Sequence, residues 1–380
     1  MSIHSEPEIL VEQRGSIAIL TLNRPHTLNA LSHNMVREIS RHISEWASDD
    51  TVAVVVLRGA GPKAFCAGGD VRAIRETYLA EGGQTQTQVH MAFFADEYRL
   101  DYQIHQYKKP IIALLDGIVM GGGMGLAQGA PFRLVGPQTK LAMPETAIGF
   151  FPDVGGSYFM SRVESGLFLA LTGQVIGAAD AIYANLASYY LEPDALENFL
   201  SDLEQHEFTT DHFAAVAQLL IRFVSTAPPS SIAPKDEPPL SLADMAEPIA
   251  RHFSWNKSLA EILDSLSCEK DGAFIDWTEQ QLETLRKRSP TALRVTHEGL
   301  TRGSVMTLAQ CFRMELEIVR QSFVAGDAVE GIRALLVDKD HAPKWNPATL
   351  ALINTNALAQ YFKETDSSHP LHNLEAQFGE

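Results

Sequence analysis

The chain has 380 residues, of which 45% are hydrophobic and 20% are charged. This composition provides a sizeable core, so a globally disordered protein is excluded, and the length fits one large domain or two. The formal net charge of −17 argues against a nucleic-acid-binding protein, which normally presents a basic surface.

The cysteines and the N-terminal residues indicate a compartment. Cys66, Cys268 and Cys311 are few and widely spaced, which is typical of a reducing compartment and leaves no zinc motif. The first residues lack the basic region and apolar run of a signal peptide, and they are too acidic for a transit peptide. No stretch has the length of a membrane helix, so we expect a cytoplasmic protein with no membrane partner.

The first half of the chain alternates strand and helix patterns. In chain order we expect a strand at 17–22, a helix capped by Ser32, a strand at 52–57, a helix from Val71, a helix at 90–107, and strands at 111–115 and 132–136. This alternation predicts an α/β fold of βα units with right-handed crossovers.

The second half of the chain becomes helical from about residue 192. Residues 194–224, 241–288 and 305–337 show helical patterns. Between the first two lies the segment 227–239, which contains five prolines. Because proline removes a backbone donor and fixes φ, we expect this segment to be a surface loop.

Three consecutive glycines at 121–123 follow the strand at 111–115 and precede a helix that starts near Met124. Glycine leaves backbone N–H groups uncovered, so an oxygen that gains negative charge can approach them closely. Two acids downstream, Glu145 and Asp153, suit general base or nucleophilic chemistry. Taken alone, the motif could also be a packing cluster of glycines with two surface acids.

A second bare loop, residues 63–71 with Gly68 and Gly69, follows the strand at 52–57. Two such loops can each supply one N–H group to a thioester carbonyl. Together with residues 23–31, the loops match the order and spacing of the crotonase (enoyl-CoA hydratase/isomerase) superfamily, which this chain resembles. The resemblance implies a crotonase-like spiral of ββα units with additional C-terminal helices and an acyl-CoA substrate. It implies no metal, and no cofactor beyond the coenzyme A of the substrate.

Further stretches resemble one branch of this superfamily, the 3-hydroxyisobutyryl-CoA hydrolases. They are residues 93–100, 143–156, 289–293 and 330–347. The simple hydratases are shorter, and the extra length here falls at roughly 192–290. The resemblance therefore implies a spiral core at 1–191, a helical insertion at 192–290 that contains the proline-rich loop, and a C-terminal helical region at 291–380. Trimers are common among crotonase folds, so the resemblance also allows a homo-oligomer.

The branch resemblance assigns roles to individual residues. Glu145 would activate water or attack the thioester directly, while Asp153 and Glu97 would orient the water and bind the substrate's 3-hydroxyl group. The N–H groups of Gly69 and Gly122 would form the oxyanion hole. The residues implied to line the substrate site are Leu28, Ala30, Ala67, Asp70 and Val71.

Position 125 distinguishes the chain from ordinary hydratases. Hydratases carry one acid at the position of Gly125 and a glycine at the position of Asp153. The shifted carboxylate favours hydrolysis of a short 3-hydroxyacyl-CoA thioester, as in valine breakdown, over hydration of a double bond. Two alternatives stay open: an enoyl-CoA hydratase or isomerase, and a catalytically idle crotonase-fold protein.

Each candidate acid also has a structural interpretation. Glu145 could favour the start of a helix, Asp153 could cap a helix near Gly155, and Glu97 could be a solvated helix acid. Cys66 is expected to be a small buried residue, because the sequence places no histidine beside it. The sequence contains no nucleophile-elbow, P-loop or dinucleotide-binding motif, and its histidines lack metal-ligand spacing.

Overall fold

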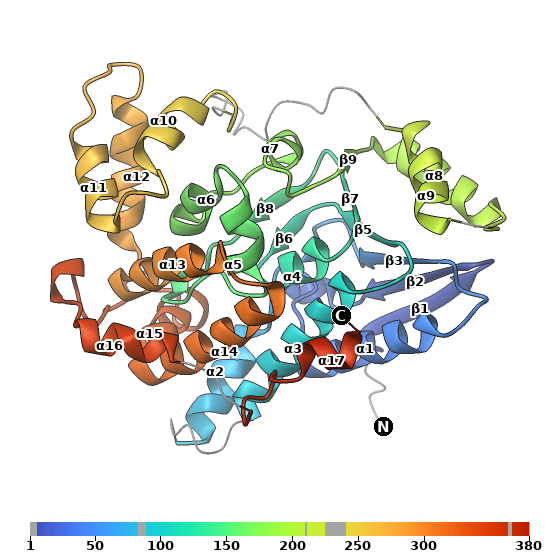
Figure 1. The fold of residues 1–380 in the computed structure, drawn as a ribbon, viewed down its shortest axis with the longest axis horizontal. Coiled ribbons are helices and arrows are strands. Elements are labelled where there is room, and N and C mark those ends of the chain that lie inside the picture. The colour runs from blue at the N-terminus through green and yellow to red at the C-terminus, as the bar shows by residue number, and fades with distance from the viewer. Residues whose placement is uncertain (1–5, 83–88, 210, 225–240, 364–366, 380) are drawn as a thin grey trace. The chain divides into compact units, whose positions relative to one another are not determined.

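The computed structural model describes residues 6–82, 89–209, 211–224, 241–363 and 367–379 (Figure 1). The chain divides into two compact units. The first comprises residues 1–69, 100–141 and 176–241, and we call it the sheet unit. The second comprises residues 70–99, 142–175 and 242–380, and we call it the helical unit.

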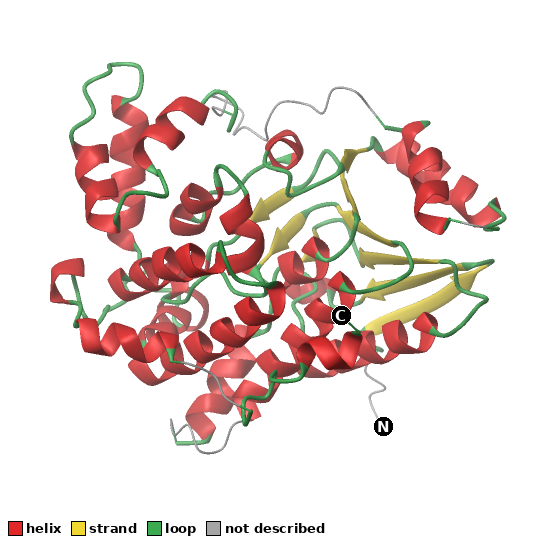
Figure 2. Cartoon of the chain, viewed as in Figure 1, coloured by secondary structure: helices red, strands yellow, loops and turns green. Residues whose placement is uncertain are grey.

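Two sheets form the framework of the sheet unit, and their strands are drawn in yellow in Figure 2. The six-stranded sheet has the order β1 (Ile9–Arg14), β2 (Ile17–Leu22), β3 (Val54–Gly59), β5 (Ile111–Leu115), β7 (Phe132–Val135) and β9 (Tyr189–Tyr190). The three-stranded sheet has the order β4 (Ala64–Cys66), β6 (Ile118–Met120) and β8 (Lys140–Ala142). β1 pairs antiparallel with β2, and the other neighbours in the large sheet pair in parallel.

Successive strands alternate between the two sheets. β3, β5 and β7 lie in the large sheet, and each is followed along the chain by a strand of the small sheet. The helix α4 (Gly122–Gln128) then follows β6. This repetition confirms the α/β class and the ββα units that the sequence resemblance implied. Because β4 and β6 pair in parallel, with Cys66 opposite Val119, the loops that follow them begin side by side.

Apolar side chains from the strands and from two helices form the core of the sheet unit. The helices are α8 (Pro193–Gln205) and α9 (His212–Ile221). The buried members include Ile17, Ile19, Val54, Val56, Ile112, Leu114, Phe132 and Leu134 from the strands and Phe199, Leu203, Val216, Leu219 and Leu220 from the helices. Besides α4, the described part of this unit also contains α1 (His33–Ala47), α7 (Ala178–Tyr183), a 3-10 turn at Pro25–Thr27, and the end of α3 (Val89–His105).

Helices make up most of the helical unit, which also holds the start of α3. They are α2 (Val71–Ala80), α5 (Gly156–Phe159), α6 (Gly166–Thr172), α10 (Ala246–His252), α11 (Leu259–Ser267), α12 (Ile275–Lys287), α13 (Pro290–Gly303), α14 (Leu308–Ala325), α15 (Asp327–Ile332), α16 (Thr355–Ala359) and α17 (Leu374–Phe378). Shorter helical turns are η2 (Glu145–Ile148), η3 (Met160–Arg162), η4 (Arg333–Val337), η5 (Leu350–Leu352) and η6 (Gln360–Phe362). Most side chains of α13 and α14 are buried, so these two helices form the centre of the unit.

Local sequence signals explain where several elements begin and end. The hydroxyl of Ser32 accepts a hydrogen bond from Met35 N and caps α1, as predicted. Thr307 and Gln310 form a capping box at the start of α14, and Gly326 ends that helix at a φ of +96°. The predicted strand at 52–57 begins two residues later, at Val54.

The predicted helical regions are correct in type but are divided. Residues 194–224 form α8 and α9, residues 241–288 form α10, α11 and α12, and residues 305–337 form α14, α15 and a π-helical turn. The proline-rich segment 227–239 lies outside the described residues. The division into regions 1–191, 192–290 and 291–380 stays a prediction.

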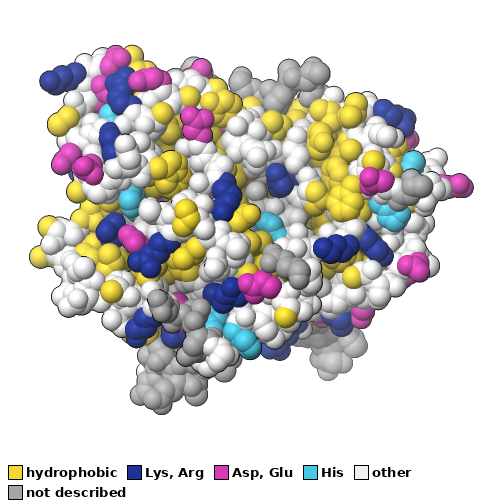
Figure 3. All heavy atoms as spheres, in the orientation of Figure 1, with side chains coloured by type: hydrophobic (Ala, Val, Ile, Leu, Met, Phe, Trp, Pro, Cys, Tyr) yellow, Lys and Arg dark blue, Asp and Glu magenta, His cyan; other side chains and the backbone are white. Residues whose placement is uncertain are grey.

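Basic and acidic side chains lie interspersed on the face of the molecule drawn in Figure 3. Exposed pairs such as Arg41–Glu45 and Lys287–Glu283 join side chains one helical turn apart. Pairs of this kind contribute only about 0.3–0.5 kcal/mol each. In the part of the chain that the structure describes, no helix is long and apolar enough to cross a membrane.

Candidate active site

The two glycine loops of the sheet unit lie against each other. Gly68 has a φ of +105°, and a Cβ atom built there would stand 3.3 Å from Met120 O and 3.5 Å from Gly122 N. Gly123 is constrained by contact instead, since its Cβ would stand 2.4 Å from Cys66 O. A side chain at Gly123 would therefore collide with backbone, and one at Gly68 would be tight and would need a strained φ. The structure brings the loop of Gly69 beside the start of α4 at Gly122.

Backbone hydrogen bonds attach the segment 28–31 to the first glycine loop. Ala67 N donates to Leu28 O at 3.0 Å, and Leu31 N donates to Gly68 O at 2.8 Å. Gly69 also lies opposite Leu31 in a parallel bridge. Three of the predicted substrate-lining residues, Leu28, Ala30 and Ala67, thus lie beside the glycine loops within the sheet unit.

Unusual backbone geometry marks this segment. Leu28 and Asn29 both have positive φ, at +56° and +57°. The buried Asn29 side chain donates to Ala60 O at 3.0 Å and to Ala64 O at 2.8 Å, and it accepts from Arg24 N. Asparagine tolerates the left-handed region, whereas leucine there is strained and must be held by its surroundings. Strain of this kind is common in binding loops.

Three acids predicted to act in the site are buried in the helical unit. Glu97 on α3 is 2% exposed, Asp153 in the loop before α5 is 5% exposed, and Glu145 at the start of η2 is 7% exposed. Glu97 Oε1 and Glu145 Oε2 have no hydrogen-bond partner among the described residues. Buried carboxyl groups are normally paired or hydrogen-bonded, so this cluster needs a functional explanation.

Burial raises the pKa of all three acids, and the charge of Asp153 raises the pKa of Glu97 and Glu145 further. Desolvation raises the pKa of Glu145 well above its usual range, and the neighbouring charge of Asp153 raises it further. The pKa of Glu97 is raised by the same two causes in the same order. Desolvation raises the pKa of Asp153 to about 7, although hydrogen bonds from Tyr98 and from its own backbone oppose the shift. These are the conditions that tune carboxyl groups for proton transfer near neutral pH.

The local sequence places Glu145 at a tight turn. Pro144 precedes it, and Phe150 N donates back to Glu145 O at 3.0 Å, which closes the turn η2. Gly149 ends η2 at a φ of +69°, where a Cβ atom would stand 2.2 Å from Asp327 O. The structural alternative is partly correct, because Glu145 does occupy the first position of a short 3-10 helix. Its carboxyl group is nonetheless buried and only partly satisfied.

The capping alternative for Asp153 is wrong. The N-cap of α5 is Gly155, and no side chain caps that helix. The Asp153 carboxylate instead accepts a hydrogen bond from the hydroxyl of Tyr98, Oη to Oδ2, at 2.7 Å. The solvated alternative for Glu97 is also wrong, because its side chain is buried. Cys66 is fully buried, as expected from the sequence.

Sequence reasoning missed two neighbours of Asp153, namely Tyr98 and Glu315. Tyr98 is fully buried on α3, one residue after Glu97. Glu315 on α14 is also fully buried, and its carboxylate accepts from Gly155 N and Ser157 N, each at 2.8 Å. An acid on the apolar face of a predicted helix was the available signal for Glu315.

Two of the predicted substrate-lining residues, Asp70 and Val71, lie at the start of α2. Asp70 is the N-cap of this helix, and its carboxylate accepts from Ala73 N at 3.3 Å. Val71 is the first helical residue. The cap gives Asp70 a structural function, and the binding role of both residues stays a prediction. Among the described residues, no group of three or more His, Cys, Asp or Glu side chains is placed to hold a metal ion.

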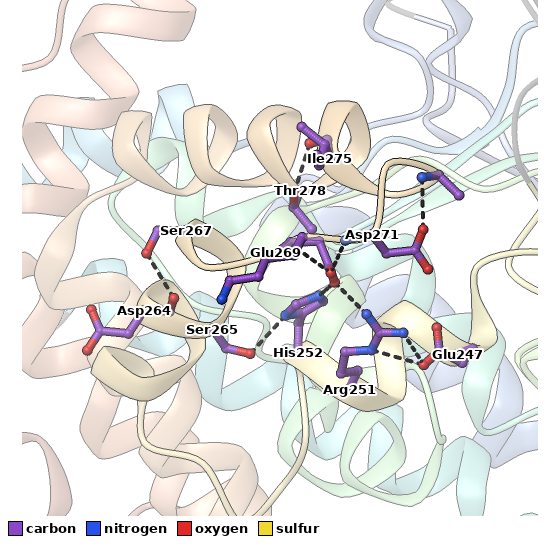
Figure 4. A network of polar contacts seen from close by, with 12 residues as sticks. Glu247, Arg251, His252, Asp264, Ser265, Ser267, Glu269, Asp271, Ile275 and Thr278 are labelled. Carbon is purple, nitrogen blue, oxygen red and sulfur yellow. Dashed lines mark hydrogen bonds and ion pairs between the residues drawn. The ribbon is translucent and has the colours of Figure 1, made fainter.

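A second polar cluster of the helical unit includes a serine, a histidine and a glutamate (Figure 4). His252 Nδ1 lies 2.8 Å from Ser265 Oγ, and its Nε2 lies 2.8 Å from Glu269 Oε2. Glu269 also accepts from the guanidinium of Arg251 and from the N–H groups of Lys270 and Asp271. Because the hydrogen-bonding groups of this cluster pair with one another, we interpret it as structural. We call His252, Ser265, Glu269 and Arg251 the clamp.

The chain is similar to known proteins over nearly its whole length. The model of the enoyl-CoA hydratase/isomerase family matches residues 17–362. The mitochondrial 3-hydroxyisobutyryl-CoA hydrolase of Danio rerio is 39% identical over 368 residues, which cover 96% of this chain and 92% of that protein. The Homo sapiens protein of the same name is 36% identical over 372 residues, with 97% and 92% coverage.

Two solved structures are similar in fold and sequence. A carnitinyl-CoA dehydratase from Mycobacterium thermoresistibile has a TM-score of 0.81 and 36% identity, covering 95% of this chain and 97% of its own. An enoyl-CoA hydratase from Rhodobacter sphaeroides 2.4.1 has a TM-score of 0.77 and 31% identity, covering 94% and 97%.

Proposed function

The chain belongs to the enoyl-CoA hydratase/isomerase family, and from this membership we propose that it hydrolyses the thioester bond of a short 3-hydroxyacyl-CoA. The substrate we favour is 3-hydroxyisobutyryl-CoA, which would yield 3-hydroxyisobutyrate and free coenzyme A. Coenzyme A is then part of the substrate and not a separate cofactor. The names and near full-length coverage of the Danio rerio and Homo sapiens relatives support this choice.

The observation that carries the proposal is the buried group of Glu97, Glu145 and Asp153. Hydration of a conjugated double bond uses an acid at the position of Gly125, which this chain lacks. It has instead a buried acid at position 153 with a pKa raised to about 7. Compared with a hydratase, the chain therefore keeps two carboxyl groups, but the second lies at position 153 instead of position 125.

In the proposed reaction Glu145 takes a proton from water, and the water oxygen forms a bond to the thioester carbon. Collapse of the tetrahedral intermediate breaks the carbon–sulfur bond, and the proton passes to the leaving thiolate. In the alternative route, the Glu145 carboxylate attacks the carbonyl carbon and expels the coenzyme A thiolate, which leaves an anhydride. Water then cleaves the anhydride, which regenerates the Glu145 carboxylate and releases the hydroxy acid, and the proton released passes to the thiolate. Both routes require Glu145 to be ionised at the start.

The N–H groups of Gly69 and Gly122 would stabilise the carbonyl oxygen as it gains negative charge. Loss of one such donor costs roughly 2.7–4 kcal/mol in a well-studied protease. The adjacent glycine loops and the absence of side chains at both positions support this role. The first N–H groups of a helix also lack partners within the helix, as at the start of α4.

Asp153 and Glu97 would bind the substrate's 3-hydroxyl group and orient the attacking water. A buried polar group that loses its partner is costly, so a site of this kind rejects substrates that lack the hydroxyl. We therefore expect 3-hydroxyisobutyryl-CoA to be cleaved faster than isobutyryl-CoA. Leu28, Ala30, Ala67, Asp70 and Val71 would contact the coenzyme A portion.

A second candidate function is hydration or dehydration of an enoyl-CoA. The two similar solved structures, a carnitinyl-CoA dehydratase and an enoyl-CoA hydratase, favour it. Gly125 counts against it, because one of the two acids of that reaction is missing. A catalytically idle scaffold is the third candidate, and the buried, unpartnered carboxyl groups count against that one.

One assay separates these candidates. Purified protein is given 3-hydroxyisobutyryl-CoA, isobutyryl-CoA and crotonyl-CoA, and free thiol and loss of the double bond are recorded in parallel. We expect thiol release to be fastest with the first substrate and at least tenfold slower with the second. Hydration of crotonyl-CoA without thiol release would replace the hydrolase by the hydratase. Failure to bind any of the three would support the idle scaffold.

A hydrolase of this kind would act in valine breakdown. The relatives' names place those proteins in mitochondria, and the cytoplasmic location expected from the sequence stays a prediction. Fractionation of cells that express the tagged full-length chain would decide between the two compartments. The homo-oligomer also stays a prediction, which light scattering of the purified protein would test.

A further inference from the structure

Glu315 is a buried acid for which the proposed reaction has no direct use. It lies on α14 between Phe312, Leu316 and Val319, which are all buried, and its own side chain is fully buried. Its Oε2 accepts Gly155 N at 2.8 Å. Its Oε1 accepts Ser157 N at 2.8 Å and the Ser157 hydroxyl at 2.5 Å. Three donors thus converge on one carboxylate.

All three donors come from the turn that follows Asp153. Val154 has a φ of +53° and Gly155 a φ of +84°, so two successive residues occupy the left-handed region. A β-branched residue there is a rare, strained conformation that the surrounding structure must enforce. Gly156 N donates to Asp153 O at 2.7 Å and closes the turn from within. Glu315 is the partner that holds the same turn from another helix.

We propose that Glu315 is a positioning residue, which acts on the reaction by fixing the backbone turn that carries Asp153. This inference rests on the proposed function, because it matters for turnover only if Asp153 contacts the substrate or the attacking water. Glu315 itself touches neither in this scheme. It acts through the N–H groups of Gly155 and Ser157.

The chemistry of position 315 favours positioning over simple packing. An apolar side chain would fit the neighbouring stripe on α14 without the cost of burying a carboxyl group. That cost is visible, since desolvation raises the pKa of Glu315, and its three hydrogen bonds, which favour the ionised form, oppose that shift. A neutral amide could accept at only one of its two terminal atoms and would set its NH₂ group against a backbone donor. Only a carboxylate accepts on both sides of the turn.

The first test measures the turn directly, in the full-length protein and without any substrate. In Glu315→Gln, we expect faster amide hydrogen exchange for the peptide that covers residues 151–159. The matched control is Glu317→Gln on the same helix, where Glu317 pairs with Arg320 and His369 instead of the turn. This control should leave exchange of the peptide unchanged. Unchanged exchange in Glu315→Gln would overturn the inference.

The second test is a double-mutant cycle with Asp153→Asn. We expect Glu315→Gln to lower kcat/KM for 3-hydroxyisobutyryl-CoA by roughly 10–100-fold, because a displacement of about 1 Å can cost that much. In the Asp153→Asn background the same change should cost less than about threefold, since the positioned group is already altered. Equal losses in both backgrounds would show a general structural effect and would overturn positioning through Asp153.

Ser157→Ala keeps the test decisive if Glu315→Gln does not fold. It removes the hydroxyl donor and leaves both backbone donors on Glu315, so we expect a smaller rise in exchange and a loss of a few fold in kcat/KM. Ser157→Ala at wild-type exchange and turnover would then reject the inference.

Thiol release by the wild-type protein tests the proposed function, and the double-mutant cycle tests the positioning role of Glu315, so the two can fail separately. If the wild-type protein releases no thiol, the proposed function fails. The cycle is then run on the dissociation constant for 3-hydroxyisobutyryl-CoA, measured by calorimetry. Coupling between positions 315 and 153 in that constant, together with faster exchange, supports the inference. Additive effects on the constant overturn it.

Discussion

Glu145 and Glu269 are two acids of the helical unit whose pKa values move in opposite directions. Glu145 is buried, whereas Glu269 is half-buried. The pKa of Glu145 is raised well above its usual range by desolvation and by Asp153. The pKa of Glu269 falls to about 2, chiefly through the N–H of Asp271, with help from His252, Lys270 and Arg251. Burial and the supply of hydrogen-bond donors together set the pKa of each carboxyl group.

The two sites differ in burial and in the number of donors that each supplies. The clamp around Glu269 uses nearly every polar group that it contains, and such saturated networks stabilise a fold. The cluster around Glu145 and Asp153 leaves carboxyl oxygens without partners, at a cost to stability. Groups left unsatisfied in this way are available to a substrate or to water. We therefore expect substitutions in the two clusters to separate activity from stability.

Glu145→Gln should give the largest change in activity. The amide keeps the shape of the side chain but cannot accept a proton from water, so thiol release should fall by about 10²–10⁴-fold. The measurement is kcat/KM for 3-hydroxyisobutyryl-CoA, with circular dichroism as the control for folding. A folded variant with near-normal turnover would show that Glu145 takes no part in the reaction, and the Glu145 cluster would then have no functional difference from the clamp.

Asp153→Asn should reduce discrimination between substrates. A hydrogen bond to a charged group is worth roughly 1.5–3 kcal/mol, or one to two decades in rate. We expect the preference for 3-hydroxyisobutyryl-CoA over isobutyryl-CoA to shrink by that order. Equal losses on the two substrates would point to water positioning, and no loss on either would exclude Asp153 from the site.

The same variant should be more stable than the wild type at neutral pH. The pKa of Asp153 is raised from 3.8 to about 7 on folding, so the folded state binds the extra proton and stability falls as the pH rises from about 4 to 7. Asparagine removes that penalty, and its melting temperature should therefore exceed that of the wild type at pH 8. A lower melting temperature at pH 8 would contradict this sign.

Tyr98→Phe should change the pH dependence of the rate more than its maximum. The hydroxyl of Tyr98 donates to the Asp153 carboxylate at 2.7 Å and lowers its pKa. Without that hydrogen bond the pKa rises above about 7, so a larger share of Asp153 is protonated at a given pH. The acid limb of the kcat/KM profile should move to higher pH, with a several-fold loss at pH 6 and little loss at pH 8.5. An unshifted limb would show that the ionised Asp153 is not required.

The glycine loops and the acids of the site could be predicted from the sequence, because residue type alone determines their chemistry. Bare backbone at Gly69 and Gly122 follows from residue type, and the structure brings the two loops together because β4 and β6 pair in parallel. The three-residue strands β4, β6 and β8 were not predicted, since three residues are too few to show a period. The divided helices of the second half could not be delimited either, because their boundaries depend on local caps.

Hydrogen-bond partners that lie far apart in the chain could not be predicted from the sequence. Glu315 meets Ser157 across 158 residues, and Tyr98 meets Asp153 across 55. Nothing in the local pattern around Tyr98 separates it from an ordinary aromatic residue of a helix core. The burial of Glu97 could not be predicted either, because an acid on a helix is usually solvated and only the tertiary packing buries this one.

Glu269→Gln should give the smallest change in activity and a change in stability opposite to that of Asp153→Asn. The amide loses one acceptor for the donors of Arg251, His252 and Asp271, so the melting temperature at pH 7 should fall. The pKa of Glu269 is lowered from 4.5 to about 2, so its stabilisation is complete above about 4.5 and is lost as the pH falls toward 2. The gap in melting temperature between wild type and variant should therefore narrow between pH 5 and pH 3.

Thiol release by Glu269→Gln at pH 7, measured well below the melting temperature, should stay within about twofold of wild type, because the clamp orders helices and takes no part in proton transfer. A loss approaching that of Glu145→Gln would instead make the serine, histidine and glutamate of the clamp part of the reaction, and the two acid clusters would no longer differ in kind.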